Sequence, residues 1–257
     1  MLYYYKIIMS NYLARNKFLN KTNIYVTECL STNDFLIHLT KKNNLPEWSN
    51  VSTGYQIKGR GQRNNQWLSQ KNKNLLFSFL FLPEIDIKDQ FNIHILVSLG
   101  IYHGLKKIGI PNISIKWPND IYVNDKKISG ILIENSISHD KIRKSIIGIG
   151  LNVNQKSFKD LKATSLINVM GKKFNLRLVF DIILKTIFYE FNSYSVSNKL
   201  PIKKYKKLLF GLNKNLNFKS DNNFFSGRIV DIRNNGNIVL LVNNEKKYFD
   251  YGSLNFL

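Results

Sequence analysis

The stretch Gly59-Arg60-Gly61-Gln62-Arg63 combines a flexible backbone with two guanidinium groups. Glycine lets main-chain N–H groups approach an anion, and arginine offers permanently charged, paired donors to phosphate or carboxylate. It is not a Walker A loop, because no Gly-Lys-Ser or Gly-Lys-Thr follows, and Asn64 stands where a dinucleotide fingerprint has its third glycine. The pattern predicts either an anion-binding loop or a solvated connection.

A second group, Lys116-Trp117-Pro118-Asn119-Asp120, joins a cation, an amide and a carboxylate around a proline. Lys116 could hold nucleotide phosphates and Asp120 could position a magnesium ion, because Mg²⁺ favours one or two carboxylates together with phosphate oxygens. The alternative is a Pro-Asn turn that is capped by its own aspartate.

Two further segments place glycine in predicted strands. Gly130 follows Lys127 by three residues, where a ligand could lie against the backbone, although a solvated pair of Lys126 and Lys127 is the simpler explanation. Residues 148–154 alternate glycine with aliphatic side chains, which costs stability unless something packs closely against the strand. A β-bulge is the alternative there.

Hydrophobic periodicity predicts the elements that position these groups. Apolar runs predict strands at 23–26, 50–56, 75–82, 113–117, 121–123, 128–134 and 146–153, and helical spacing predicts helices at 31–41, 91–107, 176–194 and 202–210. Ser31 and Asp34 are spaced as in a capping box, Gly109 and Pro111 are stop signals, and Asn124-Asp125 predicts a hairpin turn. Residues 58–74 form a polar loop, and loops of that length are usually functional or mobile.

From Leu216 the chain changes to short alternating segments at 217–219, 224–232, 237–242 and 246–251, separated by Asp-Asn, Asn-Gly and Asn-Asn turns. This pattern predicts a small β-barrel that is appended to an α+β domain. The aromatic residues Phe224, Phe225, Tyr248 and Phe249 could stack nucleic-acid bases, but they fit the core of a barrel more simply.

The composition indicates a globular, strongly basic chain. Of 257 residues, 38 are Lys or Arg and 17 are Asp or Glu, for a net charge of +21, which suggests nucleic acid, an anionic membrane surface or an acidic partner. The lysines are spread along the chain without an arginine-rich arm, which is more typical of biased composition. The single cysteine, Cys29, allows no internal disulfide, and no Cys/His cluster offers a zinc site; a reducing cytoplasm fits this usage, and we expect a cytoplasmic location. The first apolar stretch is too short to span a bilayer, so we expect neither an export signal nor a membrane span.

In their order and spacing, five segments resemble those of biotin protein ligases: Ser31-Thr32-Asn33, Gln56 with the Gly59 loop and Trp67, the Lys116 group, residues 127–134 and residues 148–154. The match covers about residues 23–154, and the carboxy-terminal segment resembles the family's SH3-like domain more weakly. The resemblance implies an α+β fold, with a mixed β-sheet and helices akin to class II aminoacyl-tRNA synthetases, followed by a small SH3-like β-barrel. Together with the change of pattern along the chain, we expect a leader at 1–22, a catalytic domain at 23–210 and an SH3-like domain at 211–257.

The resemblance implies a ligase that uses ATP and Mg²⁺ to activate biotin as biotinyl-5′-AMP and transfers it to a lysine of a biotin carboxyl carrier protein, such as a subunit of acetyl-CoA carboxylase. Lys127 and Arg60 would be catalytic, and Asp120 would hold the metal. The implied biotin-binding residues are Ser31, Thr32, Asn33, Gln56, Gly59, Arg60, Gly61, Gln62, Lys127, Gly130, Leu132 and Gly148. The implied ATP-binding residues are Arg63, Lys116, Asn119, Asp120 and Asn152.

The sequence departs from the family pattern where Gln62 and Asn65 replace a common arginine and Asn64 replaces a common glycine. We expect the adenylate to be held less tightly, with Arg63 supplying part of the missing charge. The resemblance implies no specific DNA binding, because the chain has no room for an amino-terminal winged helix, and it leaves a homodimer open. One alternative is a lipoate or octanoate ligase or transferase, which shares the fold but lacks the Gly-Arg-Gly loop and the Lys116 group. The other is a basic nucleic-acid-binding protein.

Overall fold

The computed structural model describes residues 22–63, 65–159 and 161–257. Residues 1–21 of the predicted leader therefore lie outside the described residues. The chain forms two compact units. The first comprises the described residues up to Ile85 together with Ser129–Val179, and the second comprises Asp86–Ile128 together with Phe180–Leu257.

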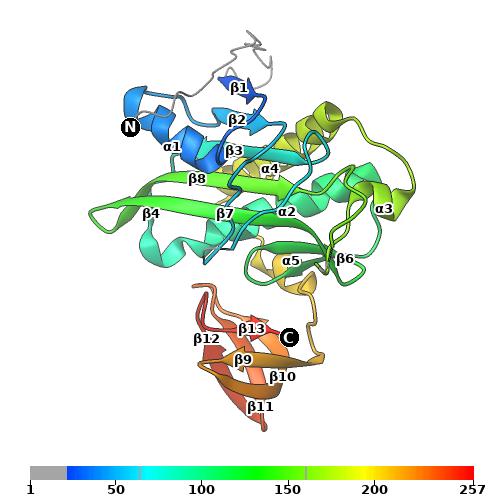
Figure 1. Cartoon of the computed structure of the whole chain (residues 1–257). Helices are drawn as coiled ribbons and strands as arrows, with labels where there is room; N and C mark the ends of the chain where they lie inside the picture. Colours follow the sequence, from blue (N-terminus) through cyan, green and yellow to red (C-terminus); the bar gives the residue numbers. More distant parts are fainter. Residues whose placement is uncertain (1–21, 64, 160) are drawn as a thin grey trace. The chain divides into compact units, whose positions relative to one another are not determined.

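The first unit is a mixed β-sheet with a helix packed against it (Figure 1). Its strand order is β1-β2-β3-β8-β7, in which β1 and β2 are parallel and the later neighbours are antiparallel. The elements are β1 (Asn23–Val26), α1 (Thr32–Lys42), β2 (Asn50–Thr53), β3 (Leu75–Phe81), β7 (Lys126–Ser138), β8 (Lys141–Leu151) and α3 (Leu166–Met170). Helix α1 contacts β2, β3 and β8, and its Leu36 is fully buried in a core with Val51 and Leu80. Short β4 (Ile85–Asp86) and the 3₁₀ turn η1 (Ile87–Asp89) follow β3 in the chain.

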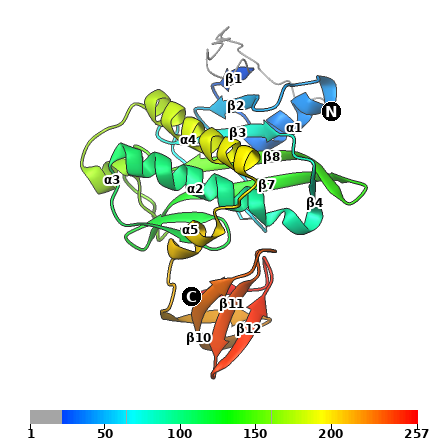
Figure 2. The ribbon, with the colours of Figure 1, turned by 180° about the vertical axis from the view of Figure 1, so that it is seen from behind.

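The second unit is built on helices α2 (Phe91–Ile108) and α5 (Ile202–Lys207) and on α4 (Leu176–Ser197) from Phe180 onward. Helices α2 and α4 lie side by side (Figure 2), because Gly100 has no side chain and the Thr186 hydroxyl donates to its carbonyl at 2.8 Å. Helix α2 also packs on strands β5 (Ile113–Lys116) and β6 (Asp120–Val123). It ends at Gly109, whose φ of 95° is left-handed, so the predicted stop signal is confirmed.

The carboxy-terminal part of the second unit is a five-stranded antiparallel sheet in the order β12-β11-β10-β9-β13. Its strands are β9 (Asn215–Ser220), β10 (Asn223–Ile232), β11 (Ile238–Val242), β12 (Glu245–Phe249) and β13 (Asn255–Phe256). The predicted Asp-Asn turn at residues 221–222 and Asn-Asn turn at 243–244 are confirmed, since all four residues have positive φ. Asn124 and Asp125 likewise have positive φ and connect β6 to β7, as expected for a hairpin turn.

The α+β fold class is confirmed, while several element boundaries were wrong. The predicted strand at 50–56 ends at Thr53, and the strand predicted at 128–134 extends to Ser138, because its pairing with β8 continues past a register shift after Ser136. Strand β13 and helix α3 were not predicted. No helix in the described parts of the chain is long and apolar enough to cross a membrane. The domain boundary predicted near residue 210 stays a prediction.

Candidate active site

The Gly59 loop folds back on itself as a short ribbon. Trp67 N–H donates to the Gly59 carbonyl at 2.9 Å, and Gly61 N–H donates to the Asn65 carbonyl at 2.7 Å. A Cβ atom on Gly59 would lie 2.5 Å from the Trp67 carbonyl oxygen, so glycine is required there for steric reasons. Just before the ribbon, Lys58 N–H donates to the Leu30 carbonyl at 2.9 Å, which joins the loop to the start of α1. Asn64 lies outside the described residues.

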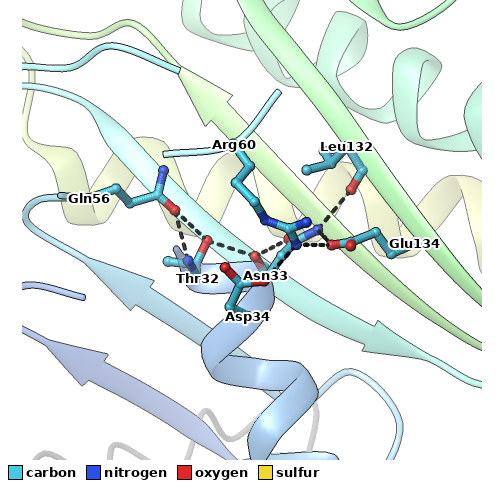
Figure 3. A network of polar contacts seen from close by, with 8 residues as sticks. Thr32, Asn33, Asp34, Gln56, Arg60, Leu132 and Glu134 are labelled. Carbon is cyan, nitrogen blue, oxygen red and sulfur yellow. Dashed lines mark hydrogen bonds and ion pairs between the residues drawn. The ribbon is translucent and has the colours of Figure 1, made fainter. Parts of the chain in front are cut away.

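The start of α1 buries polar side chains against this loop (Figure 3). Thr32 and Asn33 are only 4% and 3% exposed. The Gln56 carboxamide oxygen accepts the Thr32 backbone N–H at 2.8 Å and lies 3.1 Å from the Thr32 hydroxyl. The Asn33 amide donates to Glu134 Oε2 at 2.6 Å and to the Leu132 carbonyl at 3.3 Å. The expected biotin-binding residues Thr32, Asn33, Gln56 and Leu132 therefore lie together.

The predicted capping box is wrong. Ser31 is the N-cap residue of α1, but its side chain makes no capping hydrogen bond. The Asp34 carboxylate instead pairs with the Arg60 guanidinium at 2.8 Å. A tertiary ion pair thus takes the place of the local capping contact that the spacing suggested.

Arg60 lies between two carboxylates, since its Nη2 also donates to Glu134 Oε2 at 2.6 Å (Figure 3). Burial raises the pKa of the Asp34 carboxyl, and the adjacent Arg60 partly opposes that rise. The Arg60 side chain is 39% exposed, so the guanidinium is held in place and still accessible to solvent. A charged, oriented donor of this kind suits the recognition of a carboxylate or phosphate.

Gly148 and Gly150 are required because side chains pack directly over β8. A Cβ atom on Gly148 would lie 2.2 Å from Asn33 Oδ1, and one on Gly150 would lie 2.3 Å from the Trp67 ring. Neither glycine forms a bulge, since β3 and β8 pair in regular register from Leu75 to Phe81. Close packing over the alternating glycines was the expected explanation, and the atoms that pack there belong to Asn33 and Trp67. On the neighbouring strand β7, Gly130 pairs with Gly150 and Leu132 pairs with Gly148.

In the second unit, Lys127 and Asp120 form an ion pair, with Lys127 Nζ 2.7 Å from Asp120 Oδ1. Both side chains are largely buried, at 32% and 18% exposure, whereas Lys126 is exposed. The solvated lysine pair is therefore wrong for Lys127, because this lysine pairs with the aspartate seven residues before it. The two residues expected to serve catalysis and metal binding are in direct contact.

Lys116 and Trp117 are held by aromatic and backbone contacts in the same unit. Lys116 Nζ donates to the Tyr122 hydroxyl at 3.1 Å and lies 4.8 Å from the centre of the Phe256 ring. The buried Trp117 indole donates to the Gly236 carbonyl at 2.8 Å, in the turn between β10 and β11. Burial raises the pKa of Tyr122 to about 12, so this phenol stays neutral beside the ammonium.

Asn152 belongs to the first unit and is 3% exposed. Its amide donates to the Thr164 carbonyl at 3.0 Å, while its Oδ1 has no hydrogen-bond partner among the described residues. A buried, unsatisfied acceptor suits a ligand donor. Across the described residues, no group of three or more His, Cys, Asp or Glu side chains could hold a metal ion.

Sequence reasoning missed two residues of the polar network, Ser78 and Glu134. Ser78 is fully buried in β3, with its hydroxyl oxygen 2.7 Å from Thr32 Oγ1 and 2.6 Å from Asn33 Oδ1. The available signal was one hydroxyl within the otherwise apolar strand LLFSFLF and one carboxylate after the apolar run ILI in β7.

Of the four aromatic residues expected in the core of the barrel, two are exposed and the other two, Phe225 and Phe249, are half-buried. Phe224 is 69% exposed and Tyr248 is 50% exposed, each with a basic side chain over its ring. Phe225 and Phe249 do stack on each other at 5.6 Å. The exposed rings lie on β10 and β12, which are not neighbouring strands, so they do not form a cross-strand stacking pair.

Comparison with known proteins agrees with this fold. Residues 25–152 match the biotin/lipoate A/B protein ligase family. The bifunctional ligase/repressor BirA of Bacillus subtilis is 32% identical over 225 residues, which span 85% of this chain and 69% of that relative. The biotin–acetyl-CoA-carboxylase ligase of Paracoccus denitrificans is 30% identical over 100 residues, 38% of this chain and 41% of that one. A solved structure, the biotin protein ligase of Aquifex aeolicus in complex with biotin and ATP, is 28% identical with a TM-score of 0.78, covering 91% of this chain and 98% of that chain.

The chain therefore belongs to the biotin/lipoate A/B protein ligase family. The relatives at this level of similarity are biotin protein ligases, so the expected enzyme class, a biotin ligase, is confirmed.

Proposed function

We propose that the enzyme activates biotin with ATP as biotinyl-5′-AMP and transfers the biotinyl group to a lysine of a biotin carboxyl carrier protein. The observation that carries this proposal is Arg60, held by two carboxylates beside the buried polar start of α1. The solved relative from Aquifex aeolicus binds biotin and ATP, and the relative from Paracoccus denitrificans is named for acetyl-CoA carboxylase, which supports a carboxyl carrier protein as the acceptor.

The biotin pocket comprises the start of α1, the Gly59 loop and the paired strands β7 and β8. Gln56, with its oxygen already bonded to Thr32, directs its amide nitrogen toward the Gly59 backbone, where a polar ring could bind. Arg60 would bind the biotin carboxylate and the adenylate phosphate. The remaining proposed biotin contacts are Ser31, Thr32, Asn33, Gly59, Gly61, Gln62, Lys127, Gly130, Leu132 and Gly148.

The proposed ATP-binding residues are Arg63, Lys116, Asn119, Asp120 and Asn152. Magnesium fits this set with one protein carboxylate, Asp120, because Mg²⁺ commonly takes most of its ligands from phosphates and water. The Asp120 carboxylate already binds one cation, the Lys127 ammonium, and we propose that it can also bind the magnesium ion. When bound, the metal would withdraw charge from the phosphates of ATP.

The chemistry needs no nucleophilic side chain. A biotin carboxylate oxygen forms a bond to the α-phosphorus of ATP, and the bond to pyrophosphate breaks. The carrier lysine amine then attacks the acyl carbon of the mixed anhydride, AMP leaves, and the amine proton passes to solvent. Lys127 and Arg60 orient the reactants and stabilise the negative charge that develops, and loss of one such donor commonly costs about 3 to 4 kcal/mol of barrier.

Biotin-dependent exchange of labelled pyrophosphate into ATP tests the adenylation step. We expect exchange that requires biotin and magnesium, is not supported by lipoate and falls about 100-fold or more in Lys127→Ala. The neighbouring exposed Lys126→Ala is the matched control and should retain exchange. Folded wild-type protein without exchange would remove the ligase proposal, and equal losses in both variants would remove the role of Lys127.

The transfer step is tested with a purified biotin carboxyl carrier domain and its Lys→Arg variant at the acceptor position. Mass spectrometry should find one biotinyl group on the wild-type carrier and none on the variant. Adenylation without transfer would point to a different acceptor. A cytoplasmic location, a lack of specific DNA binding and a homodimer stay predictions.

A further inference from the structure

The oxygen atoms of Thr32, Ser78, Asn33 and Gln56 form more contacts than their hydrogens can satisfy. Three oxygen–oxygen contacts connect them: Ser78 to Asn33 at 2.6 Å, Ser78 to Thr32 at 2.7 Å and Thr32 to Gln56 at 3.1 Å. Each hydroxyl carries one hydrogen, and a carboxamide oxygen carries none. Two hydrogens therefore serve three contacts.

The distances decide where the hydrogens lie. Asn33 Oδ1 can only accept, so the contact at 2.6 Å requires the Ser78 hydrogen. Ser78 then has no hydrogen for Thr32, so the contact at 2.7 Å requires the Thr32 hydrogen. The Thr32 hydroxyl also lies 3.1 Å from Gln56 Oε1, so its single hydrogen serves the contacts to both Ser78 and Gln56.

On the other side of Asn33, Glu134 fixes the amide nitrogen. Glu134 Oε2 accepts from Asn33 Nδ2 and from Arg60 Nη2, each at 2.6 Å. Both acceptors around Nδ2, the Glu134 carboxylate and the Leu132 carbonyl, would oppose a flipped carboxamide, and the Ser78 hydroxyl donates to the oxygen on the other side. The glutamate consequently sets the orientation of the Asn33 carboxamide, and the serine, from a different strand, holds its oxygen in place.

We propose that Ser78 and Glu134 are positioning residues of the biotin pocket, which lock the Asn33 carboxamide and thereby connect the Thr32–Gln56 end of the pocket to Arg60. This inference rests on the proposed function. It replaces the direct biotin contact proposed above for Asn33 with a role in the framework of the pocket, because the amide hydrogens and one lone pair of Asn33 are used within the protein.

The test compares Ser78→Ala with Ser145→Ala. Ser145 is also fully buried in the same sheet, and its hydroxyl donates to an asparagine oxygen, Asn135 Oδ1, at 2.8 Å. Both variants lose the same kind of bond, so a purely structural effect should be similar in the two. We expect the biotin Kd, measured by calorimetry, and the KM for biotin to rise about tenfold in Ser78→Ala, with kcat and the KM for ATP within twofold of wild type. Ser145→Ala should leave all four values within twofold.

A double-mutant cycle tests whether the effects pass through Asn33. We expect Ser78→Ala to change the biotin Kd less than twofold in an Asn33→Ala background, and Ser78→Ala with Glu134→Gln to weaken binding less than the product of the single effects. If Ser78→Ala does not fold, Glu134→Gln carries the same cycle, since its side chain is 30% exposed. Additive effects, or equal binding by the Ser78 and Ser145 variants, would overturn the inference. Wild-type protein that binds no biotin would instead remove the proposed function.

Discussion

Gly148→Ala should damage the biotin pocket through one steric contact. The new Cβ would lie 2.2 Å from Asn33 Oδ1, whereas a carbon and an oxygen in contact lie about 3.3 Å apart, so Asn33 must retreat by about 1 Å. Asn33 is buried and held at 2.6 Å by both Ser78 and Glu134, so a shift of this size breaks both hydrogen bonds. A neutral bond contributes about 1 kcal/mol and one to a charged group about 2 kcal/mol, for a loss of about 3 kcal/mol.

The loss should be visible in two measurements. The free energy of unfolding in urea should fall by about 3 kcal/mol, because both hydrogen bonds are lost when Asn33 moves, and biotin affinity should fall by up to about 100-fold if the start of α1 moves with it. Gly227→Ala is the control, because its Cβ would lie 3.0 Å from a methyl group of Val242, a much milder contact than 2.2 Å. Asn33→Ala together with Gly148→Ala should be no worse than Asn33→Ala alone, since the clash is gone. Unchanged unfolding together with biotin binding within twofold of wild type would refute the reasoning.

The remaining predictions concern the second unit and the charge of the chain. Trp117→Phe removes the donor to the buried Gly236 carbonyl and should lower the free energy of unfolding, measured in urea, by about 1 to 2 kcal/mol. A loss no larger than that of a substitution at an exposed phenylalanine would contradict this prediction. Burial lowers the pKa of His94 from 6.5 to about 4, so the unfolded chain binds the proton first; stability should be complete above about pH 6.5 and fall by up to about 3 kcal/mol toward pH 4. His94→Gln should reduce this loss of stability at acid pH, measured by thermal unfolding at several pH values, whereas a substitution of the exposed His139 by Gln should not. With a net charge of +21, transfer to an acidic carrier should slow as ionic strength rises, and rates that ignore salt would exclude electrostatic steering.

Local structure was largely predictable because it depends on short-range patterns. The apolar spacing of residues 91–107 predicted α2, and the asparagine-rich turns predicted the hairpins of the carboxy-terminal sheet, where Asn and Asp tolerate positive φ. The alternating glycines of residues 148–154 predicted close packing against a strand. The order of the motifs predicted the family, which the comparisons confirmed.

Tertiary structure alone decided which side chains meet. Nothing local indicates that Asp34 leaves its own helix cap for Arg60, or that Asn33, Ser78 and Glu134, from α1, β3 and β7, form one network. The same limit explains Phe224 and Tyr248, whose aromatic character suited a core although they are exposed. Periodicity along the chain determines which face of an element is apolar, but the register of paired strands and the packing of α1 on the sheet determine which polar groups come within hydrogen-bond distance.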